Sequence, residues 1–140
     1  MEWMLMPLRR YADFSGRSRR KEYWMFALGI LLAYAVLGAL FLMGANLSAM
    51  GTGAEPEISS IGWIAISLFG ILALGIFIPS LAVIVRRLHD QDKSGWFILI
   101  QFIPYIGGII MLIFMCIEGT KGENRFGPDP KGENIADVFA

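Results

Sequence analysis

The densest cluster of chemically active side chains lies in residues 86–96, which read Arg-Arg-Leu-His-Asp-Gln-Asp-Lys-Ser-Gly-Trp and are called the loop motif below. His89, the single histidine of the chain, stands beside Asp90 and near Asp92. Imidazole and carboxylate groups ligate divalent ions and exchange protons. One histidine with two carboxylates, however, matches no complete metal site, and no nucleophile and base of recognisable spacing accompany it. We therefore favour a polar helix end and loop, and we predict no catalytic residue, no metal ion and no cofactor.

A second polar cluster, the N-terminal motif at residues 14–24, reads Phe-Ser-Gly-Arg-Ser-Arg-Arg-Lys-Glu-Tyr-Trp. We expect Glu22 or Asp90 to pair with an arginine of the other motif. Arg86 and Asp90 also have the i, i+4 spacing that allows a pair within one helix. The alternative is that the basic residues only set the topology and hold anionic lipid headgroups. The candidate residues of a shared polar face are Arg17, Arg19, Arg20, Glu22, Arg86, Arg87, His89 and Asp90.

Apolar segments must hold these motifs, because 56% of the 140 residues are hydrophobic and only 17% are charged. A chain this apolar does not belong among ordinary soluble domains. No Asp, Glu, Lys or Arg occurs in residues 23–45, 58–85 or 96–117. Each run is at least as long as the roughly 20 residues that cross a hydrocarbon core as a helix. We therefore predict an all-α membrane protein with three hydrophobic helical segments in one membrane domain, residues 1–140.

The basic residues indicate how these segments are oriented. Arginine and lysine are concentrated in residues 1–22 and 86–95, whereas residues 46–57 contain neither. Because Lys and Arg near the ends of spans stay in the cytoplasm, we expect the N-terminus and the polar loop at 86–95 to be cytoplasmic. Residues 1–22 also mix apolar, aromatic and basic side chains, as is typical of an interfacial segment on the cytoplasmic leaflet. The runs at 23–45 and 58–85 are then two transmembrane helices.

The third run, residues 96–117, is interrupted by Pro104, Gly107 and Gly108. Membrane helices tolerate proline and glycine where neighbouring groups satisfy the freed backbone. We therefore favour one kinked span, which would put the tail at 118–140 outside. The alternative is a re-entrant hairpin of two short arms, which would leave the tail in the cytoplasm. In that case two further residues would join the polar face, namely Asn124 and Arg125.

Four ordered motifs are similar to those of the bacterial DUF805 family. They are residues 14–24, residues 86–96, Ile103-Pro104 with Gly107, and residues 122–130, which read Gly-Glu-Asn-Arg-Phe-Gly-Pro-Asp-Pro. The resemblance extends from Trp3 to about Lys131, almost the whole chain. It implies a multi-pass protein of the bacterial inner membrane. The family's name records an unknown function, so the resemblance implies no substrate.

Three classes of function remain, and we favour a small scaffold or regulatory subunit that binds another membrane protein, a second copy of the chain or anionic lipid. Glycines in the first two runs permit close helix contacts. A transporter or channel subunit is the alternative, supported only by the interrupted third run and Gln101, because the spans lack the ionisable residues that usually mark ion paths. A membrane enzyme rests on the region of His89 alone, so we expect no enzymatic activity. The formal net charge of zero argues against a nucleic-acid partner.

Overall fold

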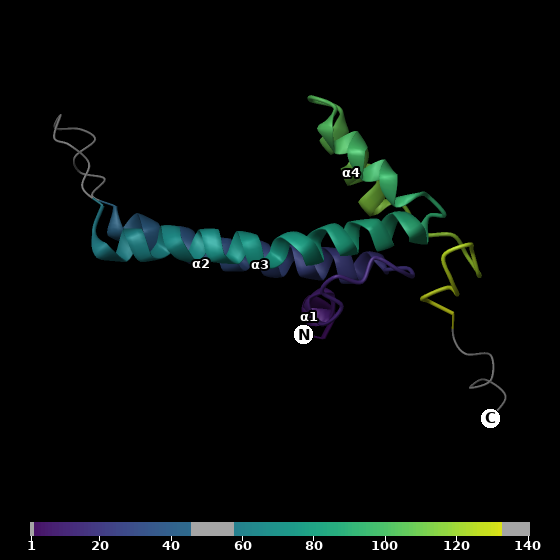
Figure 1. Ribbon diagram of the computed structural model, residues 1–140, viewed down its shortest axis with the longest axis horizontal. Helices are drawn as coiled ribbons and strands as arrows, with labels where there is room; N and C mark the ends of the chain where they lie inside the picture. Colours follow the sequence, from purple (N-terminus) through teal and green to yellow (C-terminus); the bar gives the residue numbers. More distant parts are fainter. Residues whose placement is uncertain (1, 46–57, 133–140) are drawn as a thin grey trace. The chain divides into compact units, whose positions relative to one another are not determined.

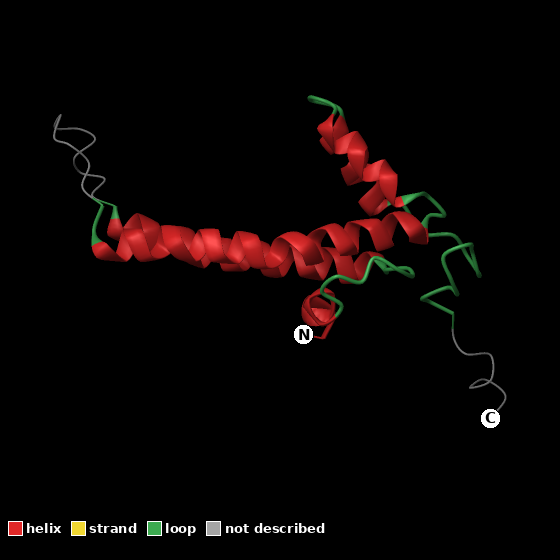
Figure 2. Ribbon diagram, viewed as in Figure 1, coloured by secondary structure: helices red, strands yellow, loops and turns green. Residues whose placement is uncertain are grey.

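The computed structural model describes residues 2–45 and 58–132. These residues form α1 (Glu2–Arg9), α2 (Arg20–Gly44), α3 (Ser60–Asp90), the 3-10 helix η2 (Gly95–Phe102) and α4 (Gly107–Cys116) (Figure 1). Within the two described ranges there are helices and turns but no strand (Figure 2). The predicted all-α class is therefore confirmed. The predicted external connection at 46–57 and the end of the tail at 133–140 lie outside the described residues.

The helices α2 and α3 have the length and composition of membrane spans, as the charge-free runs predicted. Their most apolar windows have a mean hydropathy of 2.5 and 2.6. Only 11% and 17% of these windows are buried, so the helices present apolar side chains outward, unlike the core helices of a soluble domain. α2 begins at Arg20 and α3 continues to Asp90, so both polar motifs contribute to helix ends. The loop predicted at 86–95 is therefore shorter, because residues 86–90 form the last turn of α3.

The chain forms two compact units, and each contains parts of α2 and α3. In the unit Ala27–Phe77 the two helices lie side by side (Figure 1), and the rings of Tyr34 and Phe69 stack with their centroids 5.2 Å apart. At one end of this unit, a Cβ atom on Gly44 would lie 2.2 Å from the backbone nitrogen of Gly62. No side chain fits between the two backbones there, so these two glycines make the close helix contact that the sequence indicated.

In the second unit, Met1–Phe26 with Ile78–Ala140, the third apolar run forms a hairpin. The arms η2 and α4 pack against each other (Figure 1). They contain 8 and 10 residues. At a rise of about 2.0 Å per residue in a 3-10 helix and about 1.5 Å in an α-helix, each arm is about 15 Å long, half of a roughly 30 Å hydrocarbon core. The favoured expectation of a single kinked helix is therefore wrong, and the hairpin alternative describes the structure.

The turn of the hairpin explains why the run folds back. Pro104 lacks the backbone N–H that a continuing helix would use, and Tyr105 has a positive φ of 64°. Gly107 packs directly on the other arm, since a Cβ atom there would lie 2.1 Å from the carbonyl oxygen of Ile100. A larger residue at position 107 would force the two arms apart.

The base of the hairpin is fixed on the last turn of α3. Leu88 of α3 and Met111 and Met115 of α4 are buried together. Partly buried side chains surround them, namely Tyr23, Ile84, Ile98 and Phe114. Gln91, just after α3, donates a hydrogen bond to the carbonyl oxygen of Phe114. Both ends of the hairpin therefore lie beside the loop motif.

Candidate functional site

Five charged side chains are buried together in the unit that carries the hairpin. Arg17 and Glu22 come from the N-terminal motif, and Arg86, Arg87 and Asp90 come from the last turn of α3; each is at most 6% exposed. Charged residues are almost never buried this completely unless they are paired. We call these five residues the arginine cluster.

The first pair in the arginine cluster joins α2 to α3. The Nη2 atom of Arg86 lies 3.0 Å from the Oε1 atom of Glu22, and both side chains are almost fully buried. The Nη1 group of Arg86 also donates to the carbonyl oxygens of Asp13 at 2.8 Å and of Arg10 at 3.3 Å. In return, the backbone N–H of Ser18 donates to the carbonyl oxygen of Arg86 at 3.1 Å. The expected pairing between the two motifs is confirmed for Glu22. Arg86 also holds the segment before α2 in place through these backbone hydrogen bonds.

The second pair uses both oxygens of one carboxylate. The Oδ1 atom of Asp90 accepts a hydrogen bond from Nε of Arg17 at 3.0 Å, and Oδ2 accepts one from Arg87. The pairing between motifs is thus confirmed for Asp90 as well. The pair suggested between Arg86 and Asp90 is wrong, because Arg87 reaches Asp90 with i, i+3 spacing while Arg86 binds Glu22. The side chains of consecutive residues point about 100° apart around a helix, so Arg86 and Arg87 contact different neighbours.

The segment after α4, residues 118–130, closes the arginine cluster and is called the exit. Arg17 donates to the carbonyl oxygens of Thr120 at 2.5 Å, Gly122 at 2.6 Å and Gly127 at 3.3 Å. The carbonyl oxygen of Asp90 accepts hydrogen bonds from the backbone N–H of Thr120 at 2.8 Å and from its hydroxyl group at 3.1 Å. The exit is therefore bound to the N-terminal motif and to the end of α3.

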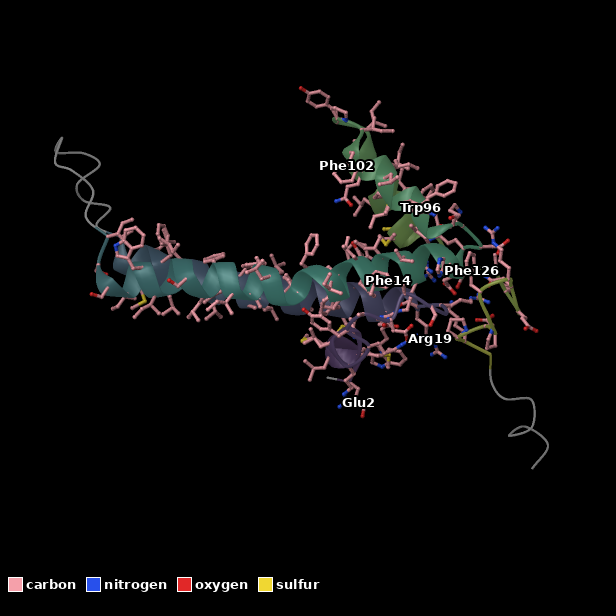
Figure 3. The ribbon with its side chains drawn as sticks, viewed as in Figure 1. Glu2, Phe14, Arg19, Trp96, Phe102 and Phe126 are labelled. Carbon is pink, nitrogen blue, oxygen red and sulfur yellow. The ribbon has the colours of Figure 1, made fainter. Side chains whose placement is uncertain are left out.

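The structure also brings the two additional candidates, Asn124 and Arg125, to this polar face. Asn124 donates to the carbonyl oxygen of His89 at 2.9 Å, and Arg125 pairs with Asp92 at 3.1 Å. The ring of His89 stacks on Phe126, which Figure 3 shows beside the end of α3, with the ring centroids 3.8 Å apart. Asn124 and Arg125 therefore join the polar face, as expected under the hairpin alternative, and His89 lies at the edge of the arginine cluster, under the exit.

Two sequence candidates, Arg19 and Arg20, stay outside the arginine cluster. Arg20 pairs with Glu118 at 3.1 Å, and both side chains are exposed. Arg19, labelled in Figure 3, donates to the carbonyl oxygen of Pro130 and lies over the ring of Trp3, 5.5 Å from its centroid. These two arginines connect the N-terminal motif to the exit and to α1 at the surface.

Some residues that contact the arginine cluster could not be recognised from their residue type. Gly119 packs so closely on the arginine cluster that a Cβ atom would lie 2.0 Å from Oδ2 of Asp90. Thr120 acts through its backbone as well as its hydroxyl group, and Ser18 acts through its backbone N–H. The sequence signal for Gly119 and Thr120 was the Gly- and Pro-rich composition of the exit. This composition indicates a turn but does not indicate which residues the turn contacts.

The chemistry of the arginine cluster is that of a clamp. Three guanidinium groups meet two carboxylates, which leaves a surplus of positive charge. Backbone carbonyl oxygens accept hydrogen bonds from the guanidinium groups and so offset this positive charge. The negative end of the α3 helix dipole lies at the same place and offsets it further. Within residues 2–45 and 58–132, no group of three or more His, Cys, Asp or Glu side chains is placed to hold a metal ion. The arrangement of guanidinium groups, carboxylates and carbonyl oxygens suits holding the three segments together.

Beside the arginine cluster, Asp13 is held in its ionised form. The hydroxyl and backbone N–H groups of Ser15 donate to its Oδ1 atom at 2.5 and 2.9 Å, and Arg10 donates to its Oδ2 atom at 2.8 and 2.6 Å. These hydrogen bonds hold the pKa of Asp13 well below its usual range, and the hydrogen bond from the Ser15 hydroxyl group has the largest effect. The turn whose carbonyl oxygen binds Arg86 is therefore stabilised while Asp13 is charged.

Known proteins resemble this chain over nearly its whole length. Residues 11–128 match the family model described as Protein of unknown function (DUF805). Inner membrane protein YhaH of Escherichia coli strain K12 is 47% identical over 133 residues, which cover 95% of this chain and 99% of the relative. Inner membrane protein YhaI of the same strain is 43% identical over 131 residues, 94% of this chain and 97% of the relative. Uncharacterized protein YiiR of that strain is 30% identical over 143 residues, with 84% and 85% covered.

No solved structure matches this chain. Its two long apolar helices agree with the inner-membrane location that the names of the relatives state. The four motifs that carried the resemblance all fall within or extend slightly past the matched residues. The chain is therefore a membrane protein and belongs to the DUF805 family.

Proposed function

We propose that this protein is a small scaffold or regulatory subunit of the bacterial inner membrane, without enzymatic activity, that binds anionic lipid and another membrane protein or a second copy of itself. The arginine cluster is the observation that carries the proposal. Its guanidinium groups bind carboxylates and backbone carbonyls of the chain itself, so they clamp the N-terminal motif, the end of α3 and the exit together. A rigid polar end of this kind suits a protein that presents a surface to a partner.

The proposed topology has a cytoplasmic N-terminus, two spans formed by α2 and α3, and a re-entrant hairpin. The excess of basic residues at 1–22 supports the cytoplasmic N-terminus. The hydrogen bonds from Thr120 to Asp90 support an exit on the same side as the end of α3. The half-length arms of the hairpin support a segment that turns back within the bilayer. All the polar motifs then face the cytoplasm.

The N-terminal segment supplies the proposed lipid-binding surface. Leu5 and Leu8 of α1 are exposed and Arg9 ends that helix, while Lys21 lies over the ring of Trp3 at 5.5 Å. Exposed apolar side chains beside cations are typical of a helix in the interface of an anionic leaflet. Each Lys or Arg near such a surface contributes about 1 kcal/mol of attraction. These features support the binding of anionic lipid by α1 and its neighbours.

Lipid-dependent stability tests the proposal. Thermal unfolding is measured in nanodiscs of phosphatidylcholine with and without phosphatidylglycerol, at low salt. We expect phosphatidylglycerol to raise Tm, and the double variant Arg9→Gln, Lys21→Gln to lose most of that rise. The matched control Lys121→Gln, Lys131→Gln removes the same charge from the exit and from the residue that follows it, and it should retain the rise. Equal losses in both variants, or no rise in the unmodified protein, would contradict the proposed surface.

The transporter alternative has one specific observation in its favour. Gln101 and Tyr23 line a cavity of about 140 Å³ together with residues of α4. Typical ligand pockets measure roughly 300–1,000 Å³, so this cavity is smaller than a usual solute site. Solute flux into proteoliposomes that is abolished by Gln101→Leu would support a transporter and overturn the scaffold proposal.

A further inference from the structure

A groove beside His89 is separate from both the arginine cluster and the α1 surface. It has a volume of about 360 Å³, and it is lined by Val85, His89, Ser94, Gly95, Trp96 and Ile98. This volume lies within the roughly 300–1,000 Å³ of small-molecule sites. Trp96, which Figure 3 places at the base of the hairpin, is 78% exposed. The groove is therefore large enough, and open enough, to admit part of a ligand.

His89 supplies a hydrogen-bond acceptor to the groove. The Nδ1 atom of His89 lies 3.3 Å from the carbonyl oxygen of Gly16 and donates its hydrogen to it. The Nε2 atom faces the groove, since a Cβ atom on Gly95 would lie 3.4 Å from it. Phe126 covers the ring, and the guanidinium group of Arg125 lies 4.8 Å from the centroid of Phe126. An apolar cover and a nearby cation both disfavour a charged imidazole, so Nε2 offers a lone pair.

The walls of the groove lie at the boundary between polar and apolar parts of the chain. Val85 is the last residue of the charge-free run 58–85, and Ile98 belongs to the hairpin. The hydroxyl oxygen of Ser94 accepts a hydrogen bond from the backbone N–H of Trp96 at 3.4 Å, which leaves the hydroxyl hydrogen able to donate. Lys93, which precedes Ser94, does not line the groove, because its ammonium group lies over the ring of Phe114, 5.0 Å from the centroid. The groove thus combines an acceptor, a donor and apolar walls.

We propose that this groove binds a phospholipid of the cytoplasmic leaflet whose headgroup carries free hydroxyl groups, as that of phosphatidylglycerol does. A headgroup hydroxyl donates to Nε2 of His89, a phosphate oxygen accepts from Ser94, and the first acyl carbons lie along Val85 and Ile98. The proposal rests on the cytoplasmic placement of this end of the protein and deepens the lipid-binding part of the proposed function.

Fluorescence quenching of Trp96 measures occupancy of the groove. A protein in which Trp3, Trp24 and Trp63 are replaced by Phe is placed in phosphatidylcholine nanodiscs with increasing fractions of phosphatidylglycerol that carries brominated acyl chains. Brominated phosphatidylmethanol is the comparison, because it is a phosphodiester with the same single charge but its headgroup has no hydroxyl group. We expect half-maximal quenching at a roughly two- to tenfold lower fraction of phosphatidylglycerol, the effect of one hydrogen bond. Equal quenching by the two lipids overturns the proposal, as does displacement of the lipid by soluble glycerol phosphate.

Variants in the groove connect this signal to the site. Gly95→Ala adds a methyl group 3.4 Å from Nε2 of His89 and 2.8 Å from Cγ1 of Val85. We expect it to remove the preference for phosphatidylglycerol. Because the methyl group also crowds Val85, the double variant Gly95→Ala, Val85→Ala relieves the crowding and should still lack the preference. Retention of the full preference in both variants would overturn the proposal.

The histidine itself supplies the last comparison. His89→Phe keeps a ring to stack on Phe126 and removes the acceptor, so it should lose the preference, whereas His89→Gln keeps an acceptor and should retain part of it. A full preference in His89→Phe would overturn the proposal. The double variant of Arg9 and Lys21 tests the α1 surface independently. If the protein with His89 and Gly95 intact shows no preference for phosphatidylglycerol in the groove but a normal α1 effect, the result contradicts the groove alone.

Discussion

Replacing Arg86 by alanine should cost far more stability than removing an exposed arginine. The side chains of Arg86 and Glu22 are 0% and 4% exposed, with the paired atoms 3.0 Å apart. Removing one partner of such a pair leaves an uncompensated buried charge and costs about 3–5 kcal/mol of unfolding free energy. The side chains of Arg125 and Asp92 are 59% and 47% exposed, and such a pair contributes about 0–1 kcal/mol. Arg125→Ala is therefore the matched control.

A double-mutant cycle separates the ion pair from other losses. Glu22→Ala should cost about as much as Arg86→Ala, because each substitution leaves the other charge unpaired. The combined variant should cost less than the two single losses together, by up to about 3 kcal/mol. It should still be less stable than the unmodified protein, since the carbonyl oxygens of Asp13 and Arg10 lose their donor, at about 1–3 kcal/mol for each unsatisfied buried group.

Reversible denaturation in mixed micelles containing SDS, followed by circular dichroism, measures these free energies. Additive losses across the cycle would refute the conclusion that a buried ion pair ties α2 to α3. A loss for Arg86→Ala no larger than that for Arg125→Ala would refute it as well. Arg86→Lys keeps the charge but cannot reproduce the donor geometry of guanidinium, so an intermediate loss is expected.

Three further tests address other parts of the fold. Gly107→Ala should open the hairpin, because its methyl group would lie 2.1 Å from the carbonyl oxygen of Ile100. Gly108→Ala is the control and should leave the hairpin closed, because its methyl group would have no atom within 4 Å. Disulfide trapping between cysteines placed on the two arms should fail only in Gly107→Ala. Because the pKa of Asp13 is lowered from 3.8, its contribution to stability is complete above that value and is lost as pH falls through the lower folded pKa. Ser15→Ala should move this loss to higher pH in acid titrations followed by hydrogen exchange of the segment before α2, and an unchanged titration would contradict the role of Ser15. A reporter fused to the C-terminus should be cytoplasmic, and external activity would contradict the re-entrant hairpin.

The two spans and the pairing of the polar motifs could be predicted because each depends on residue type along the chain. Charge-free runs of sufficient length require helices in lipid, and α2 and α3 contain them. The carboxylates Glu22 and Asp90 stand among arginines at the ends of these runs, and pairing is the arrangement that permits their burial. Sequence alone therefore predicted which segments meet at this end of the protein.

The third run and the identity of individual partners depend on tertiary contacts that sequence patterns do not encode. A kinked span and a hairpin have the same apolar composition, and the contact of Gly107 with Ile100 distinguishes them only in three dimensions. Asp90 pairs with Arg87 and not with Arg86, because the side chain of Arg86 binds Glu22 of α2. Gly119 and Thr120 contribute through close approach and backbone groups, which no residue type specifies.

The hydrogen bonds of Arg17 impose an order on the biosynthesis of this protein. Gly122, one of its acceptors, is translated 105 residues later. At about 5–20 residues per second, the interval is roughly 5 to 20 seconds. During it the ribosome completes α2 and α3 while Arg17 still lacks the exit carbonyls. Docking of the exit therefore follows the synthesis of α2 and α3, and a chain that terminates before the exit leaves the Nη1 group of Arg17 without its carbonyl acceptors, although Asp90 still binds Nε.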